Sequence, residues 1–274
     1  MDVTSGGEYV ALGSSFGAGP GLKPRAAGAP RASGRSDRNY AHLAATRLGL
    51  DLDLDLRDVT FSGATTADIL KGTRARAAQV DAVGRSTRLV TITAGGNDVG
   101  YLPALTLASL PRPIRMLPQL RRRVAAFTDP NATEQRFDQL AHDLAGLLRT
   151  LRSRAPEATI VLVDYLTILP PAASAALATD RQLAVLRESP AADLTAWGRH
   201  VAQRLSSTFA AAATAEGCDF LPVGELSRDH HAWSAEPWTR RFHLSLRGGA
   251  PFHPTAAGMA AVADLLVDHL NPRP

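Results

Sequence analysis

The sequence predicts an α/β fold, a three-layer α/β/α sandwich around a five-stranded parallel sheet. Short apolar runs rich in β-branched residues alternate with longer runs of helical apolar spacing, which is typical of a parallel sheet covered by helices on both faces. The 274 residues, of which 45% are hydrophobic and 20% are charged, can bury one large core. No long linker or repeat interrupts this pattern, so we expect a single domain over residues 1–274.

Five short apolar runs are the predicted strands. The clearest are LVTIT at 89–93 and TIVLV at 159–163, in which β-branched residues predominate. The other three span 8–12, 55–61 and 219–223.

Five segments of helical character separate or follow these strands. The strongest spans 137–151, where five large apolar side chains recur at helical spacing and form one face. The other predicted helices span 39–48, ended by Gly49, then 67–70, 194–209 and 254–270, the last with Pro254 in its first turn.

Four loops at the ends of predicted strands carry groups suited to acyl transfer. Groups that follow different parallel strands can lie close together, because the carboxyl ends of the strands meet at one edge of the sheet. The loops supply a hydroxyl in Ser15, a main-chain amide in Gly63, a side-chain amide in Asn97 and an imidazole in His253. Acyl transfer needs such a set: a nucleophile, a base within hydrogen-bond reach, and N–H donors aimed at the developing oxyanion.

In their order and spacing the four blocks resemble those of the SGNH (GDSL-type) hydrolase family of esterases and lipases, over nearly the whole chain. This resemblance implies the flavodoxin-like SGNH hydrolase fold and no metal or organic cofactor. It makes "LGSS" the block of the nucleophile Ser15 and "PFHPTAAG" the block of the base His253. It makes "FSGATT" and "TAGGND" the blocks whose Gly63 and Asn97 donate, with the Ser15 amide, to the oxyanion.

Two positions depart from the family pattern. Ser14 stands where the acidic residue before the nucleophile is usual, and Ala250 stands where many relatives have an aspartate three residues before the histidine. We therefore expect the Ala250 carbonyl to accept the Nδ1–H of His253, as in members that resemble a Ser-His dyad. Asp229 is the rival partner of the imidazole. Asp164 and Asp264 are weaker candidates.

The run GSSFG at 13–17 also matches G-x-S-x-G, the nucleophile elbow of α/β-hydrolases. That fold normally places the elbow after several strands, whereas Ser15 follows the first, so the elbow is the less favoured interpretation.

The function predicted is a serine esterase acting on short- to medium-chain acyl esters. A phospholipase or lipase acting on lipid acyl esters is one alternative, and an acyltransferase is another. A catalytically silent binding module is the least favoured, because such a module has no need of all four groups.

Composition argues against several other classes. The net charge is +4 and 5% of residues are aromatic, without a basic run interleaved with aromatics, so we expect no nucleic-acid partner. The single cysteine excludes an internal disulfide, and the adjacent His230 and His231 are better explained by loop packing than by metal binding. No apolar run is long enough for stable membrane insertion. The N-terminus lacks a signal-peptide pattern, so a cytoplasmic location is expected; secretion after removal of a signal peptide is the alternative. The oligomeric state is left open.

The segment 101–127 combines leucines, prolines and arginines directly after the Asn97 block. Its prolines are expected to break any long helix. Packing within the domain, a role as acyl pocket or lid, and binding to a lipid surface are all consistent with this composition.

Overall fold

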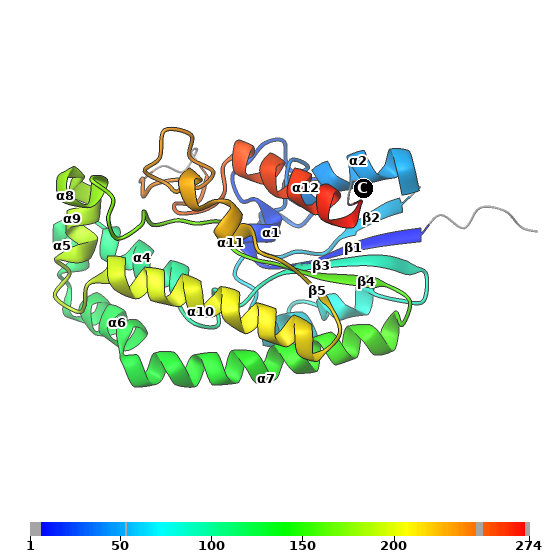
Figure 1. Cartoon of the computed structure of the whole chain (residues 1–274). Helices are drawn as coiled ribbons and strands as arrows, with labels where there is room; N and C mark the ends of the chain where they lie inside the picture. Colours follow the sequence, from blue (N-terminus) through cyan, green and yellow to red (C-terminus); the bar gives the residue numbers. More distant parts are fainter. Residues whose placement is uncertain (1–6, 53, 245–248, 272–274) are drawn as a thin grey trace, which may run out of the picture.

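The computed structural model describes residues 7–52, 54–244 and 249–271. Its sheet has five parallel strands in the order β2-β1-β3-β4-β5 (Figure 1). The strands are β1 (Gly7–Gly13), β2 (Leu54–Asp58), β3 (Thr87–Thr93), β4 (Thr159–Val163) and β5 (Asp219–Leu221). The predicted five-stranded parallel sheet is confirmed.

Helices cover both faces of this sheet. The α-helices are α1 (Ser15–Ala18), α2 (Tyr40–Leu52), α3 (Thr66–Lys71), α4 (Tyr101–Ser109), α5 (Arg112–Arg115), α6 (Pro118–Thr128), α7 (Pro130–Arg154), α8 (Ala176–Thr179), α9 (Arg181–Arg187), α10 (Leu194–Ala215), α11 (Val223–Leu226) and α12 (Ala256–Leu270). Short 3-10 turns are η1 (Arg31–Ser33), η2 (Gln79–Ala82) and η3 (Arg228–His230). Helices α2 and α12 pack together on one face, and α3, α7 and α10 lie on the other (Figure 1). None of the helices in these described ranges is long and apolar enough to cross a bilayer.

The direction of the strand order reverses between β1 and β3. After β1 the chain forms β2 on one side of it, and then crosses to form β3 on the other side. In open parallel sheets such a reversal leaves a crevice beyond the carboxyl ends of the two strands, where ligands bind. The blocks that contain Ser15 and Asn97 follow these two strands.

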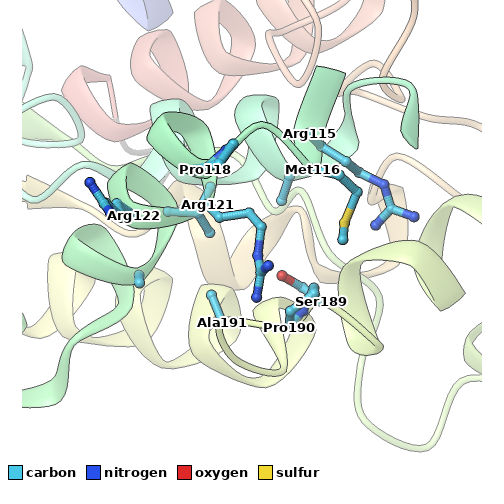
Figure 2. Close-up of a pocket in the computed structure, with 11 residues that line it drawn as sticks. Arg115, Met116, Pro118, Arg121, Arg122, Ser189, Pro190 and Ala191 are labelled. Carbon is cyan, nitrogen blue, oxygen red and sulfur yellow. The ribbon is translucent and has the colours of Figure 1, made fainter. Parts of the chain in front are cut away.

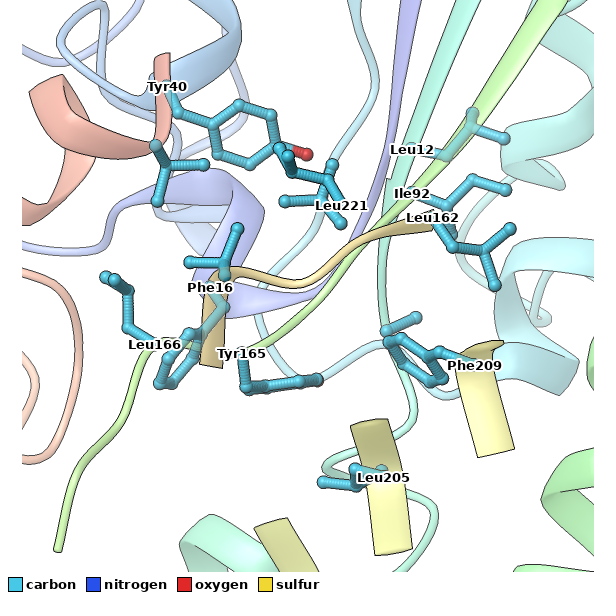
Figure 3. Packing of buried hydrophobic residues seen from close by; sticks show 14 of the residues in the cluster. Leu12, Phe16, Tyr40, Ile92, Leu162, Tyr165, Leu166, Leu205, Phe209 and Leu221 are labelled. Atoms are coloured by element: carbon cyan, nitrogen blue, oxygen red, sulfur yellow. The ribbon is translucent and has the colours of Figure 1, made fainter. Parts of the chain in front are cut away.

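Aromatic side chains fill the core beneath the carboxyl ends of these strands. Tyr165, just after β4, packs against Phe16 of α1 at a ring-centroid distance of 4.6 Å, and against Phe209 of α10 at 6.3 Å (Figure 3). All three are almost completely buried. Because interiors are close-packed, this contact row fixes α1 against the end of the sheet.

Two strands end earlier than the sequence pattern predicts. Strand β2 ends at Asp58 rather than Phe61, because the Asp58 carboxylate accepts the Thr60 N–H at 2.9 Å and closes a turn. Strand β5 ends at Leu221 rather than Val223, because Pro222 has no N–H to donate to a neighbouring strand.

Two helix boundaries also differ from prediction. Helix α2 continues through Gly49 to Leu52, so the glycine does not end it. Helix α12 begins at Ala256, since Thr255 is the N-cap and its hydroxyl accepts the Gly258 N–H at 3.1 Å. Pro254 therefore lies outside the helix rather than in its first turn. The segment 101–127 is divided among α4, α5 and α6, as its prolines predict.

Candidate active site

Ser15 is the first residue of α1, directly beyond β1. The strand ends at Gly13, whose N–H donates to the Gln79 side chain at 2.8 Å and whose carbonyl accepts from the same amide at 3.1 Å. Gly13 has a φ of 141°, which favours glycine. The Ser14 N–H then donates to the Thr93 carbonyl of β3 at 2.9 Å. These bonds fix the chain on both sides of Gly13, so the Ser15 hydroxyl emerges at a defined position above the sheet.

The structure brings Ser15 and His253 together from opposite ends of the chain. The Ser15 hydroxyl lies 2.7 Å from Nε2 of His253, and Nδ1 of the same ring lies 2.7 Å from the Pro251 carbonyl. A carbonyl oxygen can only accept, so Nδ1 carries the proton and Nε2 is free to accept from the hydroxyl. This is the tautomer that a general base for Ser15 requires.

The acceptor for the imidazole differs from the predicted one. The Ala250 carbonyl accepts the main-chain N–H of His253, at 3.4 Å, and not the ring. The ring instead donates to Pro251. Phe252, which stands between Pro251 and His253, has a φ of 61°. This left-handed conformation turns the Pro251 carbonyl toward Nδ1. The acceptor is a main-chain carbonyl, as predicted, but it is one residue further along.

None of the three aspartates proposed as rivals hydrogen-bonds to His253 in the described residues. Asp229 is exposed on η3 and acts on His231, whose pKa is lowered by burial, a shift that the aspartate opposes. Asp264 pairs with Arg47 at 2.9 Å on the surface of α12. Asp164 lies at the end of β4.

The buried Asp164 carboxylate accepts the Tyr165 N–H at 2.7 Å and the Gly224 N–H at 3.2 Å. Burial raises its pKa to about 6. It therefore braces the loops after β4 and β5 beneath the site.

The predicted oxyanion donors lie in two loops that bind each other. The Asn97 side-chain amide donates to the Ala64 carbonyl at 2.9 Å, which leaves the second N–H of its nitrogen available. The Asp98 carboxylate accepts the Thr66 N–H at 2.9 Å, and so ties the Asn97 loop to the start of α3. Gly63 has a φ of 82° and open space where a Cβ would be, so substrate can approach its amide closely. Neither the Gly63 N–H nor the Ser15 N–H has a protein acceptor among the described residues.

Burial and a nearby cation keep the imidazole neutral. The pKa of His253 is lowered to about 4, chiefly by burial; the bond to Pro251 opposes this shift and Arg240 adds to it. Arg240 is held in place because its main-chain N–H donates to the His253 carbonyl at 2.9 Å and its guanidinium donates to the Pro254 carbonyl. A base that is neutral at pH 7 is ready to accept a proton.

Sequence reasoning missed two residues that support this arrangement. The Tyr165 hydroxyl accepts the Gly96 N–H at 2.9 Å and lies 3.5 Å from the Ser14 hydroxyl. Tyr165 is the second residue after β4, and this position close to a strand end is the only feature of the sequence that could have indicated it. Gln79, which holds Gly13, lies in a 3-10 turn that no pattern in the sequence marks.

The two adjacent histidines of the Asp229 loop have separate partners. The ring of His230 stacks on Trp238 with ring centroids 3.9 Å apart, and Nδ1 of His231 accepts the main-chain N–H of Trp233 at 3.1 Å. Loop packing therefore accounts for both. Across residues 7–52, 54–244 and 249–271, no group of three His, Cys, Asp or Glu side chains is arranged to hold a metal.

A family model and curated relatives cover most of this chain. Residues 11–261 match the GDSL-like Lipase/Acylhydrolase family. Lipase 2 of Streptomyces coelicolor is 32% identical, over 96% of this chain and 86% of its own length. A lipase of Streptomyces rimosus is 29% identical, over 92% of this chain and 82% of its own length.

Solved structures share the fold. The extracellular lipase from Streptomyces rimosus superposes with a TM-score of 0.71 and 25% identity, over 97% of this chain and 98% of its own. Phospholipase A1 from Streptomyces albidoflavus superposes with a TM-score of 0.74 and 24% identity, over 98% of this chain and 100% of its own. With the matched family model spanning most of the sequence, the chain belongs to the GDSL-like lipase/acylhydrolase family and is a carboxylic ester hydrolase.

Proposed function

We propose that the protein hydrolyses carboxylic esters through a covalent acyl-Ser15 intermediate, with His253 as general base. The observation that carries this proposal is the row from the Ser15 hydroxyl through the imidazole to the Pro251 carbonyl, with both contacts at 2.7 Å. A nucleophile, its base and a group that orients the base are the minimum set for such catalysis.

Acylation begins when Ser15 Oγ attacks the ester carbonyl carbon and Nε2 of His253 accepts the hydroxyl proton. The negative charge that develops on the carbonyl oxygen is stabilised by the N–H groups of Ser15 and Gly63 and by the free amide N–H of Asn97. As the tetrahedral intermediate collapses, the imidazolium gives its proton to the departing alkoxide, and the alcohol leaves.

Deacylation repeats these steps with water. Nε2 of His253 accepts a proton from water as the water oxygen attacks the acyl carbon, and the Ser15 oxygen then recovers that proton as the acid leaves. Throughout, the Pro251 carbonyl holds the Nδ1 proton. This neutral acceptor fixes the tautomer, although it stabilises imidazolium less than a carboxylate does.

Two substrate classes fit this site. Short- to medium-chain acyl esters are the first candidate, since the site as built needs only an ester carbonyl. Lipid acyl esters are the second, and they are favoured by the relatives, since the similar Streptomyces proteins are named lipases. An acyltransferase would use the same acyl-Ser15 with an alcohol in place of water.

A chain-length series tests the proposal. Hydrolysis of p-nitrophenyl esters from acetyl to palmitoyl is measured for the native protein, for Ser15→Ala, and for Ser86→Ala as an exposed-serine control. We expect Ser15→Ala to lose at least about 10⁴-fold in kcat while Ser86→Ala stays native. The chain length with the highest kcat/KM then distinguishes esterase from lipase, and product partition with added alcohol detects acyl transfer. A folded native protein that hydrolyses none of these esters would contradict the proposal and favour a binding module.

We also propose an extracellular location, which replaces the cytoplasmic expectation. The support is the solved Streptomyces rimosus relative, which is described as extracellular. An antibody against the chain is expected to detect it in the culture medium of the native host. Detection only in the cell lysate would contradict this.

A further inference from the structure

One segment of the chain has an unbalanced positive charge. The segment from Val99 to Thr128 contains five arginines and no aspartate or glutamate. Arg112, Arg121, Arg122 and Arg123 are exposed, and none of the five pairs with a carboxylate among the described residues. Uncompensated arginines held this close together create a field that attracts anions.

The same segment exposes large apolar side chains. Ile114, Met116 and Leu117 are 42%, 37% and 49% exposed, and they lie within four consecutive residues. Only two other large apolar side chains of the described ranges are comparably exposed, Leu226 and Leu244. Exposed apolar groups concentrated in one place mark a binding surface, whereas scattered ones do not. We call residues 112–123 the α5–α6 patch.

A cavity opens within the α5–α6 patch. Its volume is about 330 Å³, and it is lined by Arg115, Arg121, Arg122 and Met116 on one side and by 189–191 on the other. In Figure 2 the Arg121 guanidinium extends toward Ser189, and Arg115 and Met116 lie on the side away from Arg122. Guanidinium groups match the geometry of phosphate oxygens, so the cavity suits a phosphodiester.

The α5–α6 patch lies at the end of the molecule where the strands terminate (Figure 1). Helix α4, which starts just after the Asn97 loop, connects the site to α5. Its nine residues span about 13 Å. The patch and the catalytic groups are therefore at the same end of the sheet.

We propose that the α5–α6 patch is a docking surface for membranes that contain anionic phospholipids. The arginines bind lipid phosphates, one of them in the cavity, while Ile114, Met116 and Leu117 insert at the boundary of the acyl chains. Anionic lipid interfaces bind surfaces that combine basic groups with exposed apolar groups. Free phosphate would contact only the basic groups and leave the apolar side chains exposed. The benefit of docking rests on the proposed function, since it would bring Ser15 to lipid esters.

Vesicle co-sedimentation tests the docking separately from hydrolysis. The probes are vesicles of phosphatidylcholine alone and of phosphatidylcholine mixed with phosphatidylglycerol. Arg121→Gln/Arg122→Gln is compared with Arg85→Gln/Arg88→Gln, which removes the same charge at the amino end of β3. We expect the first variant to bind the anionic vesicles about 30-fold more weakly, because each basic residue near such a surface contributes a factor of about five. The control is expected to bind within about twofold of native.

The apolar part has its own pair of variants. Ile114→Ser/Leu117→Ser is expected to lose on the order of tenfold in binding to anionic vesicles, and Leu226→Ser is expected to lose none. In about 1 M salt, where the Debye length is about 3 Å, all binding should weaken strongly.

Three results would overturn the docking proposal. The first is equal binding to vesicles with and without phosphatidylglycerol. The second is equal binding by the two arginine variants. The third is displacement of the protein from vesicles by a single-stranded oligonucleotide at a lower concentration than by phosphatidylglycerol. Folding is checked by thermal unfolding, and Ser15→Ala should bind vesicles as the native protein does. If the native protein does not hydrolyse p-nitrophenyl acetate but still binds anionic vesicles, the proposed function is refuted and the docking proposal stands, because vesicle binding does not need turnover.

Discussion

The imidazole of His253, the proposed general base, has an unusual electrostatic setting. Catalytic histidines in hydrolases commonly rely on a carboxylate, which raises the histidine pKa, whereas here burial and Arg240 both lower it, to about 4. At pH 7 nearly every molecule carries a neutral base. A base with a low pKa draws the serine proton less strongly, but it stays unprotonated in acid.

This setting predicts activity at acid pH. Protonated His253 cannot accept the Ser15 proton, so kcat/KM should be level above about pH 5 and fall as pH drops through about 4. Arg240→Gln removes a cation that disfavours imidazolium, so the acid limb should move to higher pH. The main-chain bond between residue 240 and His253 is retained in this variant. Arg241→Gln, whose native side chain pairs with Asp180 at 3.3 Å, is the control and should leave the limb in place. A limb unchanged in Arg240→Gln would show that Arg240 does not act on the base.

The carbonyl of Pro251 makes an aspartate unnecessary for orienting the ring. We expect Asp229→Asn to keep kcat/KM for p-nitrophenyl acetate within about twofold of native, because its carboxylate has no hydrogen bond to His253. His253→Gln is the comparison and should lose at least about 10⁴-fold. A thousandfold loss in folded Asp229→Asn would instead assign the aspartate a direct role.

The sequence indicated the proposed reactive residues but not the residues that hold them in position. The blocks around Ser15 and His253 have distinctive local patterns, and the structure places these two side chains in contact. The acceptor of the ring could not be assigned, because it depends on the left-handed conformation of Phe252, and no sequence rule expects φ above zero at a phenylalanine. The proximity of Arg240 to His253 could not be predicted either, because it depends on the path of the loop over residues 231–244.

Among the elements, the junction between β1 and α1 depends on one buried amide. The Gln79 side chain accepts the N–H of Gly13 at 2.8 Å, and Gly13 stands two residues before Ser15. The carbonyl of Gly13 has a second donor in the Phe61 N–H, at 3.0 Å, whereas no other acceptor in the described ranges serves its N–H. Loss of the amide therefore leaves one buried donor unsatisfied.

Gln79→Leu should lower the free energy of unfolding by about 1–3 kcal/mol, the cost of a buried unpaired donor. It should also reduce kcat more than it raises KM, because the position of Ser15 becomes less defined. Gln135→Leu, at an exposed position of α7, is the matched control and should change stability by less than about 0.5 kcal/mol. Equal stability of both variants in urea unfolding would rule out the Gln79 contact as a support.

Element types were predictable, and several element ends were not. The strands at 89–93 and 159–163 and the helix at 137–151 have patterns that tertiary packing reinforces, and each is present. The ends of α2 and β2 depend on competing contacts. Gly49 does not stop a helix that packs on α12, and Asp58 stops a strand through a side-chain bond that apolar patterning cannot reveal. The expectation of a single domain over 1–274 stays a prediction.

For the whole molecule, two groups near the site oppose each other in their effect on pH-dependent stability. The pKa of His253 is lowered to about 4, so the unfolded state binds more protons between about pH 4 and 6.5, and stability rises with pH there. The pKa of Asp164 is raised to about 6, so the folded state binds more protons between about pH 4 and 6, and stability falls with pH there. The two slopes partly cancel, which flattens the stability of the native protein across mild acid.

Asp164→Asn should remove the contribution of Asp164 to the pH dependence of stability and leave that of His253. The variant keeps an oxygen to accept one of the two loop N–H groups and loses the titration, so its stability relative to native should improve by about 3 kcal/mol from pH 4 to pH 7. Urea unfolding at several pH values measures this, with Asp264→Asn as a surface control that shows no such trend. A constant difference between Asp164→Asn and native across that range would mean that Asp164 does not titrate there.

The Ser15 hydroxyl and its base are 238 residues apart in the chain, and the base comes just before the final helix. A ribosome that has made all five strands has therefore not yet made an esterase. On the proposed mechanism, the nascent chain has no base for Ser15 until His253 has left the exit tunnel. On the same mechanism, a single proteolytic cut that releases the segment from His253 onward would remove the base while keeping the residues of all five strands.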